Sequence, residues 1–389
     1  MNILLHDFGS YMNNDMFTAL KRLGHHVKNT FYAIREHDDK YYNPKTEEII
    51  EKELEHNEYD CVITTNILPV AARICYEKNI PYLAWSFDSP IEVITDEYAS
   101  FPTNHFFLYD RLETEYYQKK GFDCFHHLSL AVNCERLDHI KNDNKKYICD
   151  ISLVGKLYES PLRGLTASLN DYLTGYLDGM IAMQRDIYGA YLIDELLTDE
   201  LIHSINCSYG AKEKGEPLIT KPQLSYLIAT YITRLDRITL LKILADRYDT
   251  ALFTYPLNKD EQAVLRGVRI EKPVSYLREM PKVFKASRVN LHPPLKSIKS
   301  GISLRVLDVL GCRGFLLASY LPEIAERFIP DKEVVLYESI EDACEKAAFF
   351  LKHKELRESI ARAGYEKVKK EFRFEDRFVM MFRIAGLQT

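Results

Sequence analysis

The feature that most constrains the fold of this chain is the alternation of short apolar runs with amphipathic helical stretches. In the first third of the sequence, helical periodicity occurs at 15–23, 70–78 and 111–119. Because strands that alternate with helices are joined by crossover connections, the pattern predicts a parallel sheet with helices on both faces. The expected strands are 2–5, 26–27, 60–65, 80–86 and 105–109.

A second α/β series starts near Tyr147. Between 157 and about 245 the alternation stops and apolar residues keep a helical period, which predicts a helical insertion at about 160–245. We interpret the Met and Tyr residues of this insertion as core packing. The expected strands of the series are 147–155, 250–254, 269–270, 288–291, 315–318 and 334–337, with helices that include 303–310, 340–352 and 356–372.

The two series predict two domains, as expected for 389 residues at ~100–200 residues per domain. We place the first at 1–143 and the second at 144–370, with the polar segment 141–145 as the linker. The fold class is therefore α/β, with two Rossmann-like domains and a helical insertion in the second.

Composition excludes several classes of function. The formal charge of -6 disfavours non-specific nucleic-acid binding but leaves room for a local phosphate pocket. No window approaches ~18 consecutive apolar residues, and the N-terminus lacks a basic, signal-like region, so we expect neither a transmembrane segment nor secretion. The 8 cysteines show no CxxC spacing, which favours free thiols in the cytoplasm.

Several catalytic motifs are missing from the sequence. It contains no GxGxxG, no GxxxxGK[ST], no HExxH and no GxSxG, which argues against nicotinamide dehydrogenases, P-loop enzymes, zinc proteases and α/β-hydrolases. It also contains no Asp-x-Asp pair of the kind that holds a divalent metal against a diphosphate. We therefore expect no metal and no cofactor, and a diphosphate site made of protein donors alone.

The most informative segment is 291–312, where an apolar strand enters a polar loop that leads into a helix. A helix N-terminus presents free N–H groups to a phosphate, Gly301 permits a close backbone approach, and Asp308 could accept hydrogen bonds from a ribose. The alternative is that Ser300 or Ser303 is a helix cap and Gly301 a turn residue. The candidate phosphate-binding residues here are Ser300, Gly301, Ile302, Ser303 and Arg305.

A second candidate loop follows the first strand of the second domain. Gly155, Lys156 and Arg163 lie there, near the strand ends where a ligand of an open parallel sheet binds. The two cations are candidate diphosphate clamps, and the alternative is that both are solvated surface charges.

In the first domain, Asp88 follows a buried strand that ends in the only tryptophan, Trp85. Asp88 could be a general base for an acceptor hydroxyl, or it could orient the sugar. Alternatively, it could cap the next helix or the turn through Ser89 and Pro90. His6 follows the first strand and is a second catalytic candidate, unless it is a buried, hydrogen-bonded histidine.

Taken together, these segments resemble GT-B glycosyltransferases, and more closely the spore-maturation CgeB-like family. The resemblance rests on Asn290-Leu291, on the run from Ser300 to Asp308, on Gly314-Phe315-Leu316-Leu317 and on Trp85-x-x-Asp88-Ser89-Pro90. It extends over most of the chain, and the C-terminal block is its most specific part.

The resemblance implies transfer of a sugar from a nucleotide sugar, linked to UDP, GDP or dTDP, to an acceptor. The donor would bind mainly the second domain and the acceptor the first, across a cleft. Lys156 and Arg163 fall near the phosphate positions of the family, Asp308 near the ribose position, and Ser300 where related retaining enzymes carry an acid. The sequence departs from their pattern at Ser300, so it does not decide between retention and inversion.

The resemblance also implies that Val274, Ser275 and Tyr276 lie near the nucleobase. It further implies that 371–389 forms a C-terminal helix that crosses back to the first domain. Two alternatives stay open, because fold analogy does not fix function. One is a sugar-nucleotide epimerase or hydrolase on the same fold, and the other is a non-catalytic binding partner. The acceptor and the oligomeric state are also undetermined.

Overall fold

The computed structural model describes most of the chain as two compact units. Unit 1 contains three stretches of the chain and unit 2 contains two, so each unit is discontinuous in sequence. Residues 142–144 of the predicted linker lie outside the described part, and the predicted domain limits stay predictions. The described residues are 1–34, 38–91, 95–141, 145–210 and 218–388. Unit 1 is Met1–Leu137, Gly301–Gly311 and Glu366–Thr389, and unit 2 is Asp138–Ser300 and Cys312–Tyr365.

Unit 1 is built on a sheet of six parallel strands in the order β2-β1-β3-β4-β5-β6. Its inner strands are largely buried because helices cover both of their faces. The parallel sheet predicted from the alternation is thus confirmed. The strands are β1 (Asn2–Asp7), β2 (His26–Phe31), β3 (Cys61–Thr65), β4 (Tyr82–Trp85), β5 (Asn104–Leu108) and β6 (Phe125–His127).

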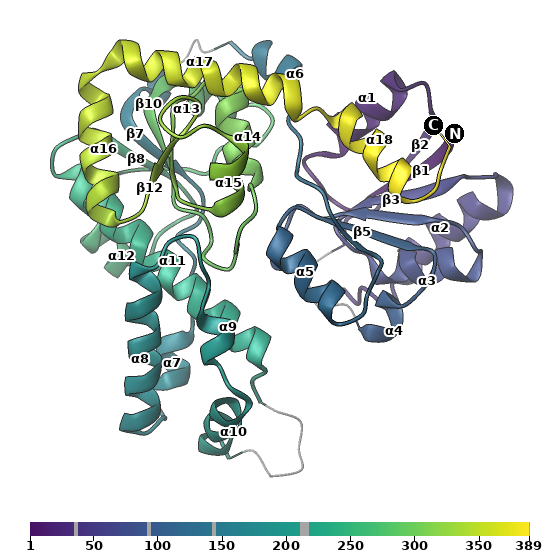
Figure 1. Ribbon diagram of the computed structural model, residues 1–389, viewed down its shortest axis with the longest axis horizontal. Helices are drawn as coiled ribbons and strands as arrows, with labels where there is room; N and C mark the ends of the chain where they lie inside the picture. Colours follow the sequence, from purple (N-terminus) through teal and green to yellow (C-terminus); the bar gives the residue numbers. More distant parts are fainter. Residues whose placement is uncertain (35–37, 92–94, 142–144, 211–217, 389) are drawn as a thin grey trace. The chain divides into compact units, whose positions relative to one another are not determined.

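The helices of unit 1 come from three separate stretches of the chain. Figure 1 shows the C-terminal helix α18 lying beside α1, and the two helices are in contact. Their bounds are α1 (Asn13–Arg22), α2 (Pro44–His56), α3 (Pro69–Glu77), α4 (Asp96–Ala99), α5 (Arg111–Lys119), α6 (Cys134–Asp138, whose last residue belongs to unit 2), α14 (Leu304–Gly311) and α18 (Phe374–Ile384).

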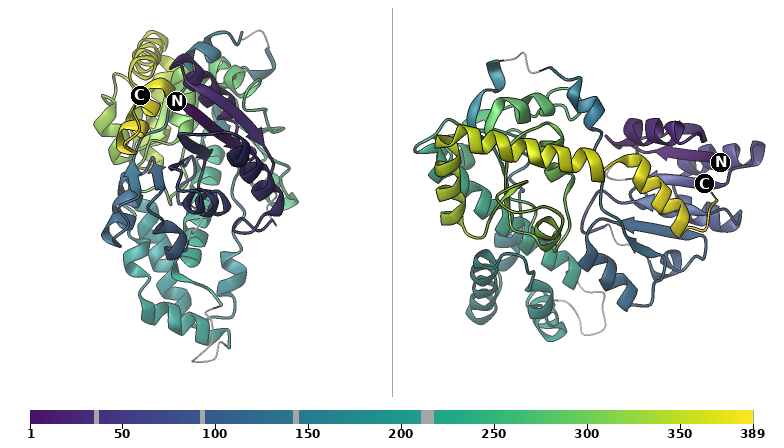
Figure 2. Two further views of the ribbon diagram at one scale, coloured as in Figure 1. Left: turned by 90° about the vertical axis from the view of Figure 1, so that its right-hand side faces the viewer. Right: turned by 45° about the horizontal axis from the view of Figure 1, so that its top comes forward.

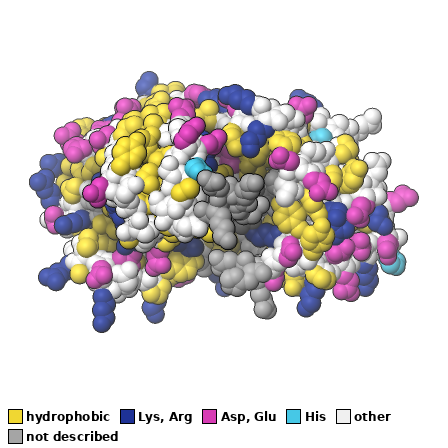
Figure 3. Space-filling view, turned by 90° about the horizontal axis from the view of Figure 1, so that it is seen from below, with side chains coloured by type: hydrophobic (Ala, Val, Ile, Leu, Met, Phe, Trp, Pro, Cys, Tyr) yellow, Lys and Arg dark blue, Asp and Glu magenta, His cyan; other side chains and the backbone are white. Residues whose placement is uncertain are grey.

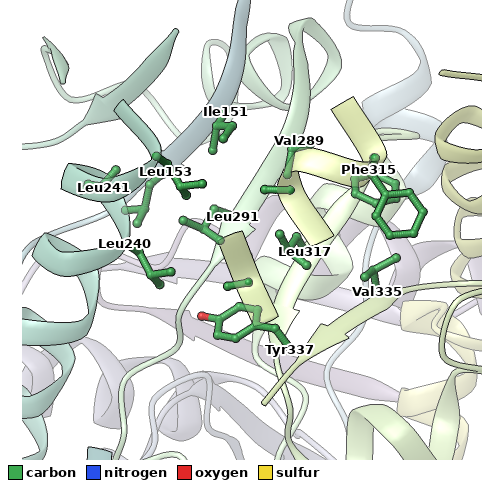
Figure 4. Packing of buried hydrophobic residues seen from close by; sticks show 14 of the residues in the cluster. Ile151, Leu153, Leu240, Leu241, Val289, Leu291, Phe315, Leu317, Val335 and Tyr337 are labelled. Carbon is green, nitrogen blue, oxygen red and sulfur yellow. The ribbon is translucent and has the colours of Figure 1, made fainter. Parts of the chain in front are cut away.

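Unit 2 has a second sheet of six parallel strands, in the order β12-β11-β10-β7-β8-β9. Side chains from β7, β10, β11 and β12 form its core, which Figure 4 shows around Leu153, Leu291 and Leu317. The strands are β7 (Cys149–Val154), β8 (Thr250–Phe253), β9 (Arg269–Glu271), β10 (Ser287–His292), β11 (Leu316–Ser319) and β12 (Val335–Tyr337).

Helices surround this second sheet. The predicted helix at 340–352 is α16, and the predicted helix at 303–310 is α14 of unit 1. The helices along this part of the chain are a 3₁₀ turn (Lys145–Tyr147), α12 (Lys259–Val264), α13 (Met280–Ala286), α15 (Pro322–Arg327), α16 (Ile340–Lys352) and α17 (Lys354–Glu371), the last of which passes from unit 2 into unit 1.

The predicted helical insertion is present between β7 and β8. Figures 1 and 2 show its helices extending away from the sheet of unit 2, and they enclose a hydrophobic cluster of their own. The insertion contains α7 (Leu162–Thr166), α8 (Asp171–Asp186), α9 (Ile193–Leu196), α10 (Asp199–Ser208) and α11 (Lys221–Ala245).

Helix α11 belongs to both hydrophobic cores of unit 2. Its 25 residues begin at a capping box in which Thr220 and Gln223 satisfy each other's backbone N–H groups. Ile228 and Ile232 pack into the core of the insertion, whereas Leu240 and Leu241 pack against the sheet. The helix therefore fixes the insertion to the sheet.

The surface carries charges of both signs. On the face in Figure 3, Lys and Arg side chains are interspersed with Asp and Glu, in keeping with a net charge of -6. Among the residues that the structure describes, no helix has the length and apolarity needed to span a bilayer.

Candidate functional site

The strand order locates the expected ligand site of each unit. In open parallel sheets, ligands bind beyond the carboxyl ends of the strands, where the order changes direction. In unit 2 this change falls between β7 and β10, and in unit 1 between β1 and β3. The loops that follow these four strands are therefore the candidate site segments.

In unit 2, one buried arginine joins the two loops at the change of direction. Arg237 of α11 is 6% exposed. Its Nε and Nη2 donate hydrogen bonds to the carbonyl of Pro293 at 3.1 and 2.7 Å, and its Nη1 donates to the carbonyl of Lys156. Its guanidinium also lies 4.9 Å from the ring centroid of Tyr158. Arg237 thus fixes the loop after β7 to the loop after β10.

The loop after β10 carries Lys296, which is paired with α11. The Lys296 ammonium lies 3.5 Å from Oδ2 of Asp236 and 4.2 Å from the ring centroid of Tyr188. Oδ1 of Asp236 accepts a hydrogen bond of 3.0 Å from Arg185. Burial lowers the pKa of the Lys296 ammonium below its usual range, and the neighbouring Asp236 opposes that shift.

Lys299, three residues further along the same loop, makes a similar contact. Its ammonium lies 2.6 Å from Oδ2 of Asp194 in α9 and 5.9 Å from the ring centroid of Tyr191. Together with Lys296 it lines a small hollow that is partly open to solvent. Its walls are formed by 187–190, 294–296, 298–299 and 319–321, and we call it the Lys296 pocket.

Gly189 shapes one wall of the Lys296 pocket. Its φ of +79° is in the region that favours glycine, and a Cβ there would lie 2.6 Å from a ring carbon of Tyr320. The insertion can therefore approach the residues after β11 only because position 189 has no side chain.

In unit 2, the Ser300 hydroxyl donates a hydrogen bond to another protein side chain. Its Oγ donates to Oε1 of Glu323 at 2.8 Å, and the Glu323 amide donates to the Ser300 carbonyl at 3.1 Å. Both residues are buried, at 0% and 3% exposure. Related retaining enzymes carry an acid at the position of Ser300. In this structure the position holds a hydroxyl, which is hydrogen-bonded to the carboxylate of Glu323.

The other candidates after Ser300 belong to unit 1. A Cβ on Gly301 would lie 2.8 Å from the Tyr109 carbonyl and 2.9 Å from Cα of Asp110, so the close backbone approach there is to protein atoms. Asp308 is 3% exposed within α14. Ile302 and Ser303 are buried and Arg305 is half-buried.

The cations predicted after β7 are both exposed. The Lys156 ammonium lies 5.4 Å from the ring centroid of Tyr255. Arg163 of α7 is ion-paired with Asp178 at 2.5 Å and donates to the hydroxyl of Tyr231 at 2.9 Å. Arg163 is therefore engaged within the insertion.

The segment predicted to meet the nucleobase forms a turn after β9. The Ser275 amide donates to Oε2 of Glu279 at 3.0 Å, and the Tyr147 hydroxyl donates to Oε1 at 2.9 Å. The hydrogen bond from the Ser275 backbone is the largest of several contacts that lower the pKa of Glu279. Val274 and Tyr276 flank this ordered turn and are half-buried.

In unit 1, Asp88 is exposed and its orientation is fixed by Asn66 after β3. The Asn66 amide donates to Oδ2 of Asp88 at 2.7 Å. Asn66 Oδ1 accepts hydrogen bonds from the Ser86 hydroxyl and the Phe87 amide at 3.2 and 2.8 Å. The structure thus joins the segments after β3 and β4 through one side chain, and it leaves a carboxylate exposed at the end of β4.

His6 is fully buried on β1. Its Nδ1 lies 3.0 Å from Oγ1 of Thr30, and Nε2 has no hydrogen-bond partner among the described residues. Burial lowers its pKa to about 4, so the imidazole is neutral at pH 7. This geometry favours the buried, hydrogen-bonded alternative for His6.

Some site residues were not singled out from the sequence. Asp236 and Arg237 lie in the middle of α11, where Arg234 and two threonines also interrupt the apolar residues, so the local sequence does not mark them as buried. Lys296, Lys299 and Glu323 carry no local signal of burial. Across the described ranges, no cluster of three or more His, Cys, Asp or Glu is placed to hold a metal ion.

Comparison with solved structures defines the fold. The chain is similar to a glycosyltransferase from Rickettsia africae ESF-5, with a TM-score of 0.60, 10% identity and 98% of each chain covered. It is also similar to Anabaena HepE in complex with UDP-glucose, with a TM-score of 0.55, 9% identity and 99% of each chain covered. The two Rossmann-like units therefore have the GT-B fold of glycosyltransferases, which confirms the predicted fold class.

A third similar structure is S. aureus MnaA with UDP, at a TM-score of 0.52 and 10% identity, covering 99% of this chain and 97% of that one. In sequence, residues 234–383 match the family model described as glycosyl transferase-like. The matched stretch begins within α11 and ends within α18. No sequence among the curated proteins matches this chain.

Proposed function

We propose that this protein is a glycosyltransferase that moves a sugar from a nucleoside-diphosphate sugar to an acceptor. The observation that carries the proposal is the family match over 234–383, the stretch that holds Arg237, both loop lysines and the Ser300–Glu323 pair. UDP is the first nucleotide to test, because Anabaena HepE and S. aureus MnaA were both solved with UDP or a UDP-sugar. GDP and dTDP donors remain in the proposal.

For the nucleotide sugar, the proposed site supplies hydrogen-bond donors and cations that bind the diphosphate leaving group. Backbone N–H groups and fixed cations stabilise developing phosphate charge without reorganising. In this proposal Asp308 holds the ribose, and the 274–276 turn meets the nucleobase. The proposed phosphate contacts are Gly155, Lys156, Arg163, Ser300, Gly301, Ile302, Ser303 and Arg305.

The acceptor side of the proposal rests on unit 1. Asp88 is an exposed carboxylate held in place by Asn66, which suits a general base for an acceptor hydroxyl. His6 is a proposed second participant, although its burial supports a role in holding β1 against β2. Whether the acceptor is a protein, a glycan or a small molecule stays open.

We also propose a family, a metal-independent reaction and a cellular location for this protein. Membership of the CgeB-like family is supported by the run from Ser300 to Asp308 and by the segment from Trp85 to Pro90. Catalysis without a bound metal is supported by the missing Asp-x-Asp pair. A cytoplasmic location is supported by the cysteines, all 8 of which are free thiols.

The test is a thermal-shift panel of UDP-, GDP-, dTDP- and CMP-sugars, each with and without Mg²⁺. A ligand at 100 times its Kd adds ~2.7 kcal/mol of stability, so a true donor gives a clear shift. We expect one nucleotide class to stabilise the protein equally well with and without Mg²⁺. Conversion of that donor with no acceptor present would instead favour an epimerase or hydrolase. The absence of a shift with every donor would favour a non-catalytic partner.

A further inference from the structure

We propose that Lys296 and Lys299 form the anion-binding site of unit 2 and hold a phosphoryl group in the Lys296 pocket. The identification of that group with the diphosphate of a nucleotide rests on the proposed function. Both lysines follow β10 at the change of strand order, and both line the pocket. Neither residue belongs to the phosphate contacts expected from the sequence.

The ion pair between Lys296 and Asp236 can open at a low cost in free energy. Asp236 is 4% exposed and would be strongly destabilised if it lost all its cations. However, Arg185 binds its Oδ1 at 3.0 Å, whereas the Lys296 ammonium lies 3.5 Å from its Oδ2. Because Arg185 balances the Asp236 carboxylate, Lys296 can turn to a ligand anion without leaving a buried charge unpaired.

The partner of Lys299 is also held independently of it. Oδ1 of Asp194 accepts a hydrogen bond of 2.5 Å from the Ser225 hydroxyl, while Oδ2 takes the Lys299 ammonium. The Asp194 side chain is 36% exposed, so water can replace Lys299 there. Each lysine therefore shares its carboxylate with a second donor that belongs to the insertion.

Burial favours these lysines over the cations after β7. Side-chain exposure is 13% for Lys296 and 25% for Lys299, against 49% for Arg163. A charge-assisted contact to an anion is stronger where water is partly excluded. The two loop lysines are thus better shielded from water than Arg163.

The experiment measures the binding of pyrophosphate and UDP to the full chain by calorimetry at fixed low salt. The variants are Lys296→Gln, Lys299→Gln and the double substitution, and the matched control is the exposed surface lysine variant Lys259→Gln. We expect each single variant to weaken pyrophosphate binding about tenfold or more, since a lost charge-assisted contact has that effect. The double variant should bind no pyrophosphate, and Lys259→Gln should bind like the wild type.

A further variant separates anion binding from a structural role of the lysine pair. In Asp236→Asn, Lys296 loses its competing carboxylate, so pyrophosphate should bind as tightly as in the wild type or more tightly. If Asp236→Asn weakens binding as much as Lys296→Gln does, the pair is structural and the proposal is overturned. Far-UV circular dichroism of each variant monitors the fold.

The outcomes distinguish this proposal from the proposed function. If Lys156→Gln and Arg163→Gln abolish UDP binding while both loop-lysine variants keep it, the anion site is wrong and the glycosyltransferase proposal stands. If pyrophosphate binding requires the loop lysines but UDP-glucose binds no more tightly than pyrophosphate and no sugar is transferred, the anion site stands and the glycosyltransferase proposal fails. Failure of the wild type to bind pyrophosphate at millimolar concentration overturns the anion site.

Discussion

At the scale of single residues, burial determines what a polar side chain in this protein can do. Asp88 and His6 were both candidates for acid–base chemistry, yet the structure gives them opposite environments. Asp88 is exposed and accepts a hydrogen bond from the Asn66 amide, whereas His6 is fully buried on β1. An exposed carboxylate is accessible to an acceptor substrate. A neutral, buried imidazole mainly affects the stability of the fold.

His6 therefore predicts a pH dependence of stability. Its pKa of about 4 in the folded chain lies below the usual 6.5, so between these values the unfolded chain binds a proton that the folded chain does not. The unfolding free energy should fall as the pH drops through this window, by up to about 3 kcal/mol from His6 alone. His6→Asn should lose this contribution.

Urea unfolding at several pH values between 7 and 4, followed by tryptophan fluorescence, tests the His6 prediction. His105, whose pKa is also lowered by burial to about 4, gives a similar slope in both proteins, so the difference between them isolates His6. Identical pH profiles for wild type and His6→Asn would show that His6 does not titrate in this way.

At the scale of secondary-structure elements, α11 determines how the loops of unit 2 are arranged. Arg237 contributes its guanidinium to the carbonyls of Lys156 and Pro293, which lie 81 and 56 residues away in sequence. Arg237→Met should leave buried carbonyl oxygens without donors, at a cost of about 2–3 kcal/mol in unfolding free energy. Lys242→Met, at an exposed position of the same helix, should stay within ~0.5 kcal/mol of the wild type.

Calorimetry and amide hydrogen exchange check the Arg237 prediction. Exchange should accelerate in the loops after β7 and β10, because Arg237 holds both. Equal melting temperatures for Arg237→Met and Lys242→Met, together with unchanged exchange, would mean that the loops are fixed by other contacts.

The secondary-structure elements also show what the sequence patterns could predict and what they could not. Strands such as β3 and helices such as α16 were expected because their apolar residues follow a clear period. The three residues of β6 include two histidines, so only pairing with β5 makes this segment a strand. In α2 the only buried apolar residue is Ile50, too few to give a periodic signal.

The candidate site was predictable only in part. Local sequence indicated the loops after β7 and β10, because strand ends and turn residues are local features. It could not show that Arg163 pairs with Asp178 or that Lys296 meets Asp236, since these contacts depend on how the insertion folds back. Which cations are available to a ligand is thus a tertiary property.

At the scale of the whole molecule, unit 1 depends on the last residues of the chain. Helix α18 packs against α1, and its Phe374 and Phe378 rings lie 5.8 and 6.0 Å from the ring of Trp85 at the end of β4. Trp85 is the only tryptophan and is fully buried. Its fluorescence therefore reports whether the C-terminal helix α18 is packed against the sheet of unit 1. The strands of that sheet all come from the N-terminal third of the chain.

Phe378→Ala should shift Trp85 emission to longer wavelength and lower the unfolding free energy of unit 1 by about 3–5 kcal/mol, because it opens a cavity beside the indole. Met380→Ala is the matched control, since Met380 lies on the same helix and is 43% exposed. It should change neither the emission maximum nor the unfolding transition by a comparable amount. If Phe378→Ala leaves both unchanged, α18 does not cover Trp85 in solution, and the sheet of unit 1 is stable without the end of the chain.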